Sequence, residues 1–170
     1  MGPRECHTSG RIHDIGFRAW VAAQRHMGFE MDPRELSDAE CAKLKKVTQW
    51  WKVNRDWRHS ADIKRLAPAD PAIIAEIQVS PKQDRFVAFI GSAETSAWSC
   101  PAPVQLTGLK TDTMYHVTLV NRDEKTAASR GKNAFDAETL RLSGRFLMAH
   151  GVDLPNQFPD RMWVLEGVAE

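Results

Sequence analysis

Cysteine is scarce in this chain of 170 residues, which contains only Cys6, Cys41 and Cys100. The count is odd, the spacings are wide, and no Cys-x-x-Cys pair occurs. A zinc site built on cysteines is therefore not expected. We expect three free thiols in a reducing compartment.

Long hydrophobic runs are missing as well. No apolar run reaches the roughly 18 residues that a membrane-spanning helix needs. The first ten residues are polar and lack the apolar region of a signal peptide, so we expect a cytoplasmic protein. Excess charge is also absent, because 23 Lys and Arg residues oppose 22 Asp and Glu residues. Without a global field, neither a nucleic-acid partner nor a membrane partner is expected, although a local basic patch is not excluded.

The remaining composition is that of an ordinary globular protein, with 42% hydrophobic and 26% charged residues. The length fits one domain, or one domain and a piece of another, and it allows a core without disulfides or metals. We expect no metal site and no cofactor.

The first 59 residues have a helical pattern. Met1 to Gly10 reads as a loop, and an apolar face predicts a helix from about Ile15 to Met27. The segment Ser37-Asp-Ala-Glu40 has the pattern of a capping box, in which each side chain binds the other residue's backbone amide. A long helix is expected from there to about His59.

The long helix carries a broad apolar face and an opposite basic face. The apolar residues are Cys41, Leu44, Val47, Trp50, Trp51, Val53 and Trp57. The basic residues are Lys43, Lys45, Lys46, Lys52 and Arg55. So broad an apolar face must pack against something large. The helical part therefore resembles the tail of a larger domain, and the isolated chain is expected to expose apolar surface around Leu44, Trp50, Trp51 and Trp57.

After a junction at residues 60–72, the period of hydrophobicity changes to two. Alternation predicts strands around residues 73–79, 87–89, 104–106, 115–119, 146–148 and 162–166. Residues 121–139 read as a long excursion between strands. Several short strands without an intervening long helix indicate an antiparallel sandwich rather than βαβ units.

Three segments of the helical part resemble the carboxy-terminal region of glycoside hydrolase family 36 α-galactosidases. They are Phe17-Arg-Ala-Trp20, the run from His26 to Ser37, and the run from Lys52 to Ser60. Met1 to Arg11 is similar to the loop after the family's last barrel strand. The turns at Val79 to Arg85 and at Leu106 to Leu109 are similar to turns of the family's carboxy-terminal domain. The segment Ser143 to Met148 resembles that domain only loosely.

The resemblance implies an α+β fold with two parts. Residues 1–60 would be the terminal helices of a (β/α)8 barrel, and residues 61–170 a carboxy-terminal antiparallel β-sandwich of Greek-key type. The parent would be a retaining α-galactosidase that removes terminal α-linked galactose from oligosaccharides such as melibiose and raffinose. Its two catalytic carboxylates would stand about 5–5.5 Å apart.

The same resemblance places both catalytic aspartates ahead of this chain, and the family's Lys-Trp-Asp-like nucleophile motif is absent here. No residue of the chain is therefore expected to be catalytic, and its substrate-binding residues stay unassigned. The chain alone would be inactive and would support barrel packing or oligomer assembly. Its partners would be the missing amino-terminal and barrel portion of the same polypeptide, and a homo-oligomer is possible; the parent would bind a galactosyl oligosaccharide.

Several residue groups resemble sites but have simpler explanations. Cys6, His7 and His13 match no common zinc spacing and read as polar loop residues. Glu30, Asp32 and Glu35 flank a helix N-terminus, where negative charge is favourable without any acid–base role. The helical spacing of Trp50, Trp51 and Trp57 indicates packing rather than a sugar platform.

Two alternative functions stay open at this stage. A stand-alone carbohydrate-binding module would use an exposed aromatic residue, and Trp98, in a loop beside Cys100, is a better candidate than Trp163. A nucleic-acid binder would use the basic face of the long helix. No helix-turn-helix or other reader motif supports the second alternative.

Overall fold

The computed structural model describes residues 1–98, 102–125, 133–136, 139–155 and 158–170. The chain divides into two compact units, Met1–Trp57 and Arg58–Glu170. Each unit is described by itself below. No helix in the described part of the chain is both long enough and apolar enough to cross a bilayer.

The first unit is helical, as predicted. It contains helix α1 (Ile15–Ala23), the short 3-10 helix η1 (Pro33–Glu35) and helix α2 (Asp38–Arg58), whose last residue belongs to the second unit. Asp14 caps α1 by accepting a 2.8 Å hydrogen bond from the Gly16 amide. Arg18 links α1 to the start of the chain, because its Nη1 atom donates a 2.7 Å hydrogen bond to the Gly2 carbonyl oxygen.

The capping box at the start of α2 is confirmed. The Ser37 amide donates to Glu40 Oε2 over 2.9 Å, and the Glu40 amide donates to Ser37 Oγ over 3.4 Å. These bonds satisfy two amides that the first turn of a helix leaves without partners. The hydrogen bonds from Ser37 also hold the pKa of the Glu40 carboxyl below its usual range.

Helix α1 ends four residues before the predicted Met27. The Gln24 and Arg25 amides donate to the carbonyls three residues back, at 3.3 Å each, which tightens the last turn. The Arg25 carbonyl accepts a 2.8 Å hydrogen bond from Trp51 Nε1. A tertiary contact from α2 thus takes up a carbonyl beyond the end of α1, and hydrophobic spacing does not reveal such a contact.

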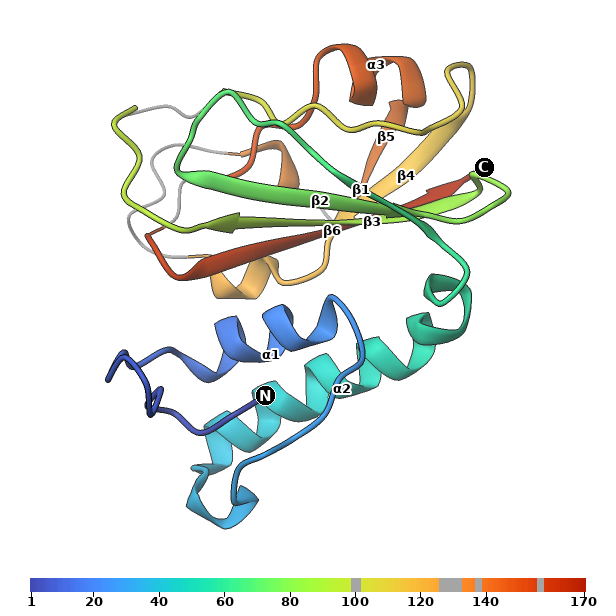
Figure 1. The fold of residues 1–170 in the computed structure, drawn as a ribbon. Helices are drawn as coiled ribbons and strands as arrows, with labels where there is room; N and C mark the ends of the chain where they lie inside the picture. The colour runs from blue at the N-terminus through green and yellow to red at the C-terminus, as the bar shows by residue number, and fades with distance from the viewer. Residues whose placement is uncertain (99–101, 126–132, 137–138, 156–157) are drawn as a thin grey trace. The chain divides into compact units, whose positions relative to one another are not determined.

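The second unit is built on one six-stranded antiparallel sheet in the order β1-β2-β3-β6-β4-β5 (Figure 1). The strands are β1 (Asp62–Arg65), β2 (Ile73–Val79), β3 (Arg85–Ser92), β4 (Met114–Leu119), β5 (Leu140–Ser143) and β6 (Arg161–Ala169). The last strand of the chain therefore lies in the middle of the sheet, between β3 and β4.

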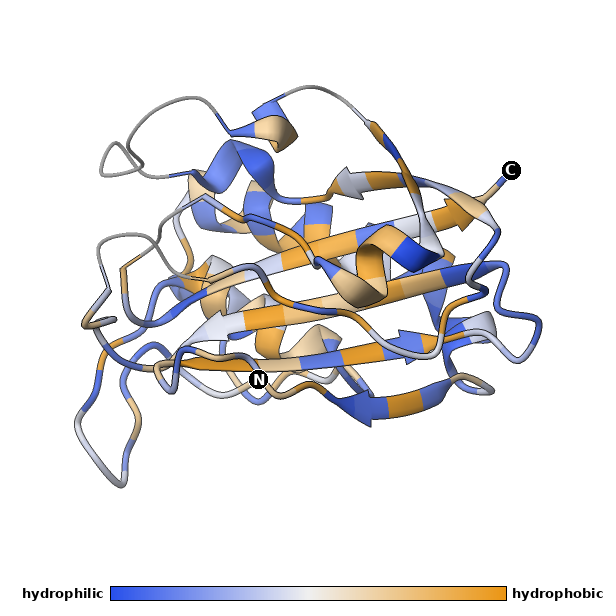
Figure 2. Ribbon diagram, turned by 90° about the horizontal axis from the view of Figure 1, so that it is seen from above, coloured by the Kyte–Doolittle hydropathy of each residue, from blue (hydrophilic) through white to orange (hydrophobic). Residues whose placement is uncertain are grey.

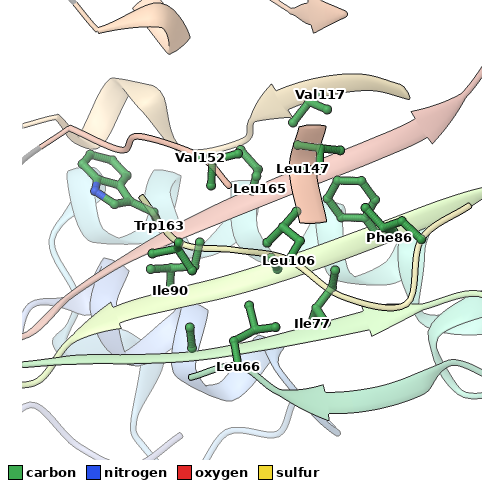
Figure 3. Packing of buried hydrophobic residues seen from close by; sticks show 14 of the residues in the cluster. Leu66, Ile77, Phe86, Ile90, Leu106, Val117, Leu147, Val152, Trp163 and Leu165 are labelled. Atoms are coloured by element: carbon green, nitrogen blue, oxygen red, sulfur yellow. The ribbon is translucent and has the colours of Figure 1, made fainter. Parts of the chain in front are cut away.

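The core of this unit lies on one face of the sheet. Alternate residues of β2, β3, β4 and β6 point into it, including Ile77, Phe86, Val117 and Leu165. Leu106, Leu147 and Val152 pack against these side chains from segments outside the sheet (Figure 3), and Leu66, Val104 and Leu109 belong to the same cluster. Leu147 belongs to helix α3 (Gly144–Ala149). Two 3-10 helices, η2 (Arg122–Glu124) and η3 (Ala134–Asp136), complete the described elements.

The predicted antiparallel β domain is thus confirmed in its coarse form, but its second layer differs from a regular sandwich. Within the described residues, all six strands belong to one sheet. The facing layer is formed by α3 and by residues 102–112, which bond to α3 through the Leu106 amide and the Leu147 carbonyl at 3.0 Å. The first unit is not itself a barrel, so the assignment of residues 1–60 to barrel helices is not supported by the fold.

Two short segments predicted as strands are not strands. Residues 146–148 lie in α3, which Ser143 caps by accepting a hydrogen bond from the Phe146 amide at 3.1 Å. A pattern of three residues cannot distinguish a period of two from a helical turn. The residue that could have indicated a helix is the N-cap Ser143. At residues 104–106 the chain is extended, but only Val104 forms a β-bridge, with Val152.

Conversely, both edge strands were missed. Strand β1 lies in the predicted junction, and β5 begins just after the predicted excursion of residues 121–139. Strand β1 is hydrophilic except for Ile63, whereas the central strands β2, β3 and β6 are largely hydrophobic (Figure 2). Charged edge strands discourage pairing with other chains. Strand β1 lacks apolar alternation, and β5 (Leu140-Arg-Leu-Ser143) alternates over only four residues, which is too short a pattern to identify a strand.

A glycine lets β6 approach β3 closely. Gly167 pairs with Phe86, whose ring lies over the glycine, and a Cβ atom at residue 167 would overlap that ring. The Phe86 ring also meets the Tyr115 ring edge-on, with 5.6 Å between centroids. Tyr115 is fully buried, and its hydroxyl donates to the Gln83 carbonyl over 2.8 Å. Phe86 is itself only 1% exposed, so displacing its ring would disturb the packed core.

We predict that Gly167→Ala destabilises the chain by about 1–3 kcal/mol, the usual cost of overpacking a core. Gly91→Ala is the matched control, because it lies in β3 and its Cβ would make no close overlap: it would lie 3.4 Å from the flexible end of Met162 and 3.7 Å from two backbone carbonyl oxygens. Chemical denaturation followed by circular dichroism measures both variants. Equal stability of the two variants would contradict the close approach of Phe86 to Gly167.

Candidate functional site

The loop at the start of the chain, which carries Cys6 and His7, folds into a tight turn. The Cys6 amide donates to the Arg11 carbonyl over 2.9 Å, and Glu5 forms a β-bridge with Ile12. Hydrogen bonding to Ser9 lowers the pKa of the Cys6 thiol. The described residues contain no group of three or more His, Cys, Asp or Glu side chains that could hold a metal ion. Cys6 and Cys41 are free thiols, and Cys100 lies outside the described residues.

Of the acidic residues in the 30–35 segment, Asp32 has a clear role in the local fold. Asp32 caps η1 through a 2.9 Å hydrogen bond from the Arg34 amide and forms a 2.6 Å ion pair with the Arg34 guanidinium. These contacts lower the pKa of the Asp32 carboxyl, which is therefore held as an acceptor and is unsuited to act as a general acid. Glu30 lies near the chain start, where its amide donates to the Met1 carbonyl over 2.9 Å.

The tryptophans of α2 are held by contacts within the first unit. Trp50 meets the buried Trp20 ring edge-on, with 5.3 Å between centroids, and Trp51 binds the Arg25 carbonyl. Trp57 Nε1 donates to Asn54 Oδ1 over 2.9 Å. All three are half-buried.

The tryptophans of the β unit differ from each other. Trp163 is buried in the core, and its Nε1 donates to the Pro155 carbonyl over 2.9 Å. Trp98 is 45% exposed on a loop. The Ser96 hydroxyl accepts a 3.0 Å hydrogen bond from the Trp98 amide and donates to the carboxylate of the buried Asp70 over 2.5 Å. The exposed ring is therefore attached to an anchored backbone.

The basic residues of α2 do not form one uniform surface. Lys43 forms an ion pair with Asp14 at 3.6 Å, and Arg55 lies over the Trp51 ring and pairs with Asp56. Lys45 and Lys52, by contrast, line a groove. The predicted basic face is thus divided among local contacts and one concave site.

The groove lies between α2 and the irregular segment that precedes it, and its volume is about 470 Å³. Its lining is mainly apolar with polar and basic side chains added: Phe29, Met31, Pro33, Leu36, Cys41, Leu44, Lys45, Thr48, Gln49 and Lys52. The volume is in the range of binding sites for small ligands or side chains of a partner. Among the described residues, no acidic side chain lines it.

This groove was not identified from the sequence. Exposed apolar surface was expected around Leu44, Trp50, Trp51 and Trp57; all four are half-buried, and Leu44 lines the groove. The other wall comes from residues 29–36, where Pro33 interrupts helical periodicity and hides the shared face of Phe29, Met31 and Leu36. The signal that could have revealed it is a run of apolar residues in a segment that is neither helix nor strand.

Comparison with known proteins places this chain in a family. Residues 73–165, more than half of the chain, match the glycosyl hydrolase family 36 C-terminal domain. Among curated proteins, the chain is 26% identical over 166 residues to an α-galactosidase of Escherichia coli, which covers 94% of the chain but only 23% of that enzyme.

Solved structures share the fold. The galactosidase domain of an α-galactosidase–sucrose kinase aligns over 99% of the chain with a TM-score of 0.82 and 22% identity. A family 36 α-galactosidase of Geobacillus stearothermophilus, in complex with raffinose, aligns over 98% with a TM-score of 0.75 and 21% identity. This chain covers 21% of each of these two proteins. It therefore spans less than a quarter of the relatives it matches.

Proposed function

The chain belongs to the family of glycosyl hydrolase family 36 C-terminal domains, and we propose that it is the carboxy-terminal part of a retaining α-galactosidase. The parent would remove terminal α-linked galactose from oligosaccharides such as raffinose and melibiose. The observation that carries the proposal is the coverage, because 94% of this chain matches only 23% of an α-galactosidase. The raffinose complex of a structural relative supports the substrate class.

The chemistry of the parent would lie outside this chain. Retaining glycosidases use two carboxyl groups about 5–5.5 Å apart, one as nucleophile and one as acid and base. A (β/α)8 barrel that carries such groups takes about 250 residues. That is more than the 170 residues present here. We therefore assign no catalytic residue to the chain.

The role of the chain itself would be structural. Residues 1–60 would complete the packing of the barrel, and residues 61–170 would form the carboxy-terminal β domain. The extensive core of the β unit supports this role, because a domain with its own core can buttress a neighbour. We also propose that the parent works in the cytoplasm, which the free thiols of Cys6 and Cys41 support. Assembly into a homo-oligomer would be a further use of this part.

We predict that residues 1–170 alone do not release galactose from raffinose or from p-nitrophenyl α-galactoside.

We also predict that the complete enzyme loses most of its hydrolysis when it is truncated after residue 60, with a lower melting temperature, because the β domain supports the barrel. The complete enzyme with Val53→Ala, an exposed residue, is the control. Turnover by the isolated chain, or full activity and unchanged melting of the truncated enzyme, would contradict the proposal.

A second candidate function has one observation in its favour. Trp98 combines an exposed ring with a backbone anchored through Ser96 to Asp70. An exposed aromatic ring on an anchored backbone suits a sugar-binding surface, because an ordered backbone loses little entropy on binding. The chain could then act as a carbohydrate-binding module, either alone or within the parent.

If this second function is correct, the isolated chain binds galactose or raffinose, and Trp98→Ala weakens the binding by about tenfold or more, as truncation of a central aromatic contact does. Phe158→Ala is the matched control, because Phe158 is also an exposed aromatic residue, at 56% exposure. Isothermal titration calorimetry measures the affinities. No detectable binding by the unmodified chain would remove this function.

A further inference from the structure

The groove along α2 has the form of a helix-docking site. Six of its lining residues lie on one face of α2, at positions 41, 44, 45, 48, 49 and 52. These positions follow the spacing of three and four that keeps side chains on one side of a helix. The stripe extends over the twelve residues from Cys41 to Lys52, or about 16 Å at the helical rise. An amphipathic helix typically binds in such a groove through its apolar face.

The charges of the groove define the chemistry of its occupant. Phe29, Met31, Leu36 and Leu44 offer an apolar surface, and Phe29 is 48% exposed. Lys45 and Lys52 are the charged lining residues, seven positions and two helical turns apart. Their ammonium groups favour an occupant with carboxylates at a similar spacing, about 10 Å, beside its apolar residues.

The described helices of this chain cannot supply that occupant. Helix α1 (sequence IGFRAWVAA) and helix α3 (sequence GRFLMA) contain no acidic residue. The acidic residues of α2 are confined to its two ends, at Asp38, Glu40 and Asp56. A second copy of the chain therefore offers no described helix with carboxylates two turns apart on an apolar face.

We propose that the groove receives an acidic amphipathic helix from the part of the parent polypeptide that lies outside residues 1–170. This inference rests on the proposed function, and the 21–23% coverage of the relatives supplies the missing chain from which the helix would come. Docking places apolar residues of that helix against Leu44, Met31 and Phe29 and its carboxylates near Lys45 and Lys52. The contact attaches the first unit to the rest of the enzyme.

Cys41 provides a probe, because its exposed thiol lines the groove. The experiment compares the alkylation rate of Cys41 by N-ethylmaleimide in the complete polypeptide and in residues 1–170, read by peptide mass spectrometry. Circular dichroism first establishes that the isolated chain is folded. We expect Cys41 to react at least about tenfold more slowly in the complete polypeptide, as a thiol excluded from solvent does. Equal rates would overturn the proposal.

The variant Val53→Cys controls for general shielding, because Val53 is 80% exposed on α2 and lies outside the groove. Its reaction rate should be the same in both polypeptides. If alkylation at residue 53 is slowed as much as alkylation of Cys41, the shielding from solvent is not specific to the groove and the proposal fails.

Charge reversal tests the acidic character of the occupant. In the complete polypeptide, Lys45→Glu with Lys52→Glu should restore fast alkylation of Cys41. The matched pair Lys46→Glu with Arg55→Glu makes the same charge change on α2 outside the groove and should leave Cys41 protected. If Cys41 stays protected in the first pair, the proposal of an acidic occupant is overturned.

Raffinose hydrolysis on the same samples reports separately on the proposed function, since an active polypeptide with an accessible Cys41 contradicts only the docking.

Discussion

The pairing of β6 with both β3 and β4 is the interaction on which the rest of the β unit depends. Among the described strands, β1, β2 and β3 form one half of the sheet and β4 and β5 the other, and β6 is the strand that joins them. The join brings together residues far apart in the chain, such as Phe86 and Gly167. Such a non-local pairing costs loop-closure entropy before it contributes stability. The final residues of the chain are therefore part of the centre of the sheet.

Side chains outside the ladder reinforce this central strand. Asn121 is fully buried just after β4; its amide donates to the Met162 carbonyl over 2.7 Å, and its oxygen accepts from the Val164 amide over 3.0 Å. It thus continues the pairing beyond the end of β4. At the other end, Phe86 fills the space over Gly167. Both devices fix the register of β6, because a shift by one residue would turn its core face outward.

The sequence was informative where structure depends on neighbouring residues. The capping box of α2 and the strands β2, β4 and β6 follow from local patterns at Ser37, at Ile73 and in the last strand. It was uninformative where a segment is short or polar, as in β1, β5 and α3. The α1 end and the groove depend on contacts between distant residues, such as Trp51 with Arg25, and those leave no local pattern. The absence of catalytic residues from the chain stays a prediction.

The two units suggest a division of labour within the proposed enzyme. The β unit has a core of its own, with Tyr115 and Phe86 packed at its centre. The helical unit holds its start through Arg18 and presents a groove beside Leu44 that the described helices do not fill. A self-contained domain and an attachment surface are what a carboxy-terminal support needs. The resemblance to family 36 enzymes and these physical features lead to the same account.

The most direct test of this account is to read the coding DNA upstream of the Met1 codon. The account predicts an open reading frame that continues in phase and encodes a (β/α)8 barrel with two carboxylates placed for retaining hydrolysis. A stop codon in phase, preceded by a ribosome-binding site next to Met1, would contradict it. The chain would then be made alone, and sugar binding at Trp98 would become the leading explanation of its function.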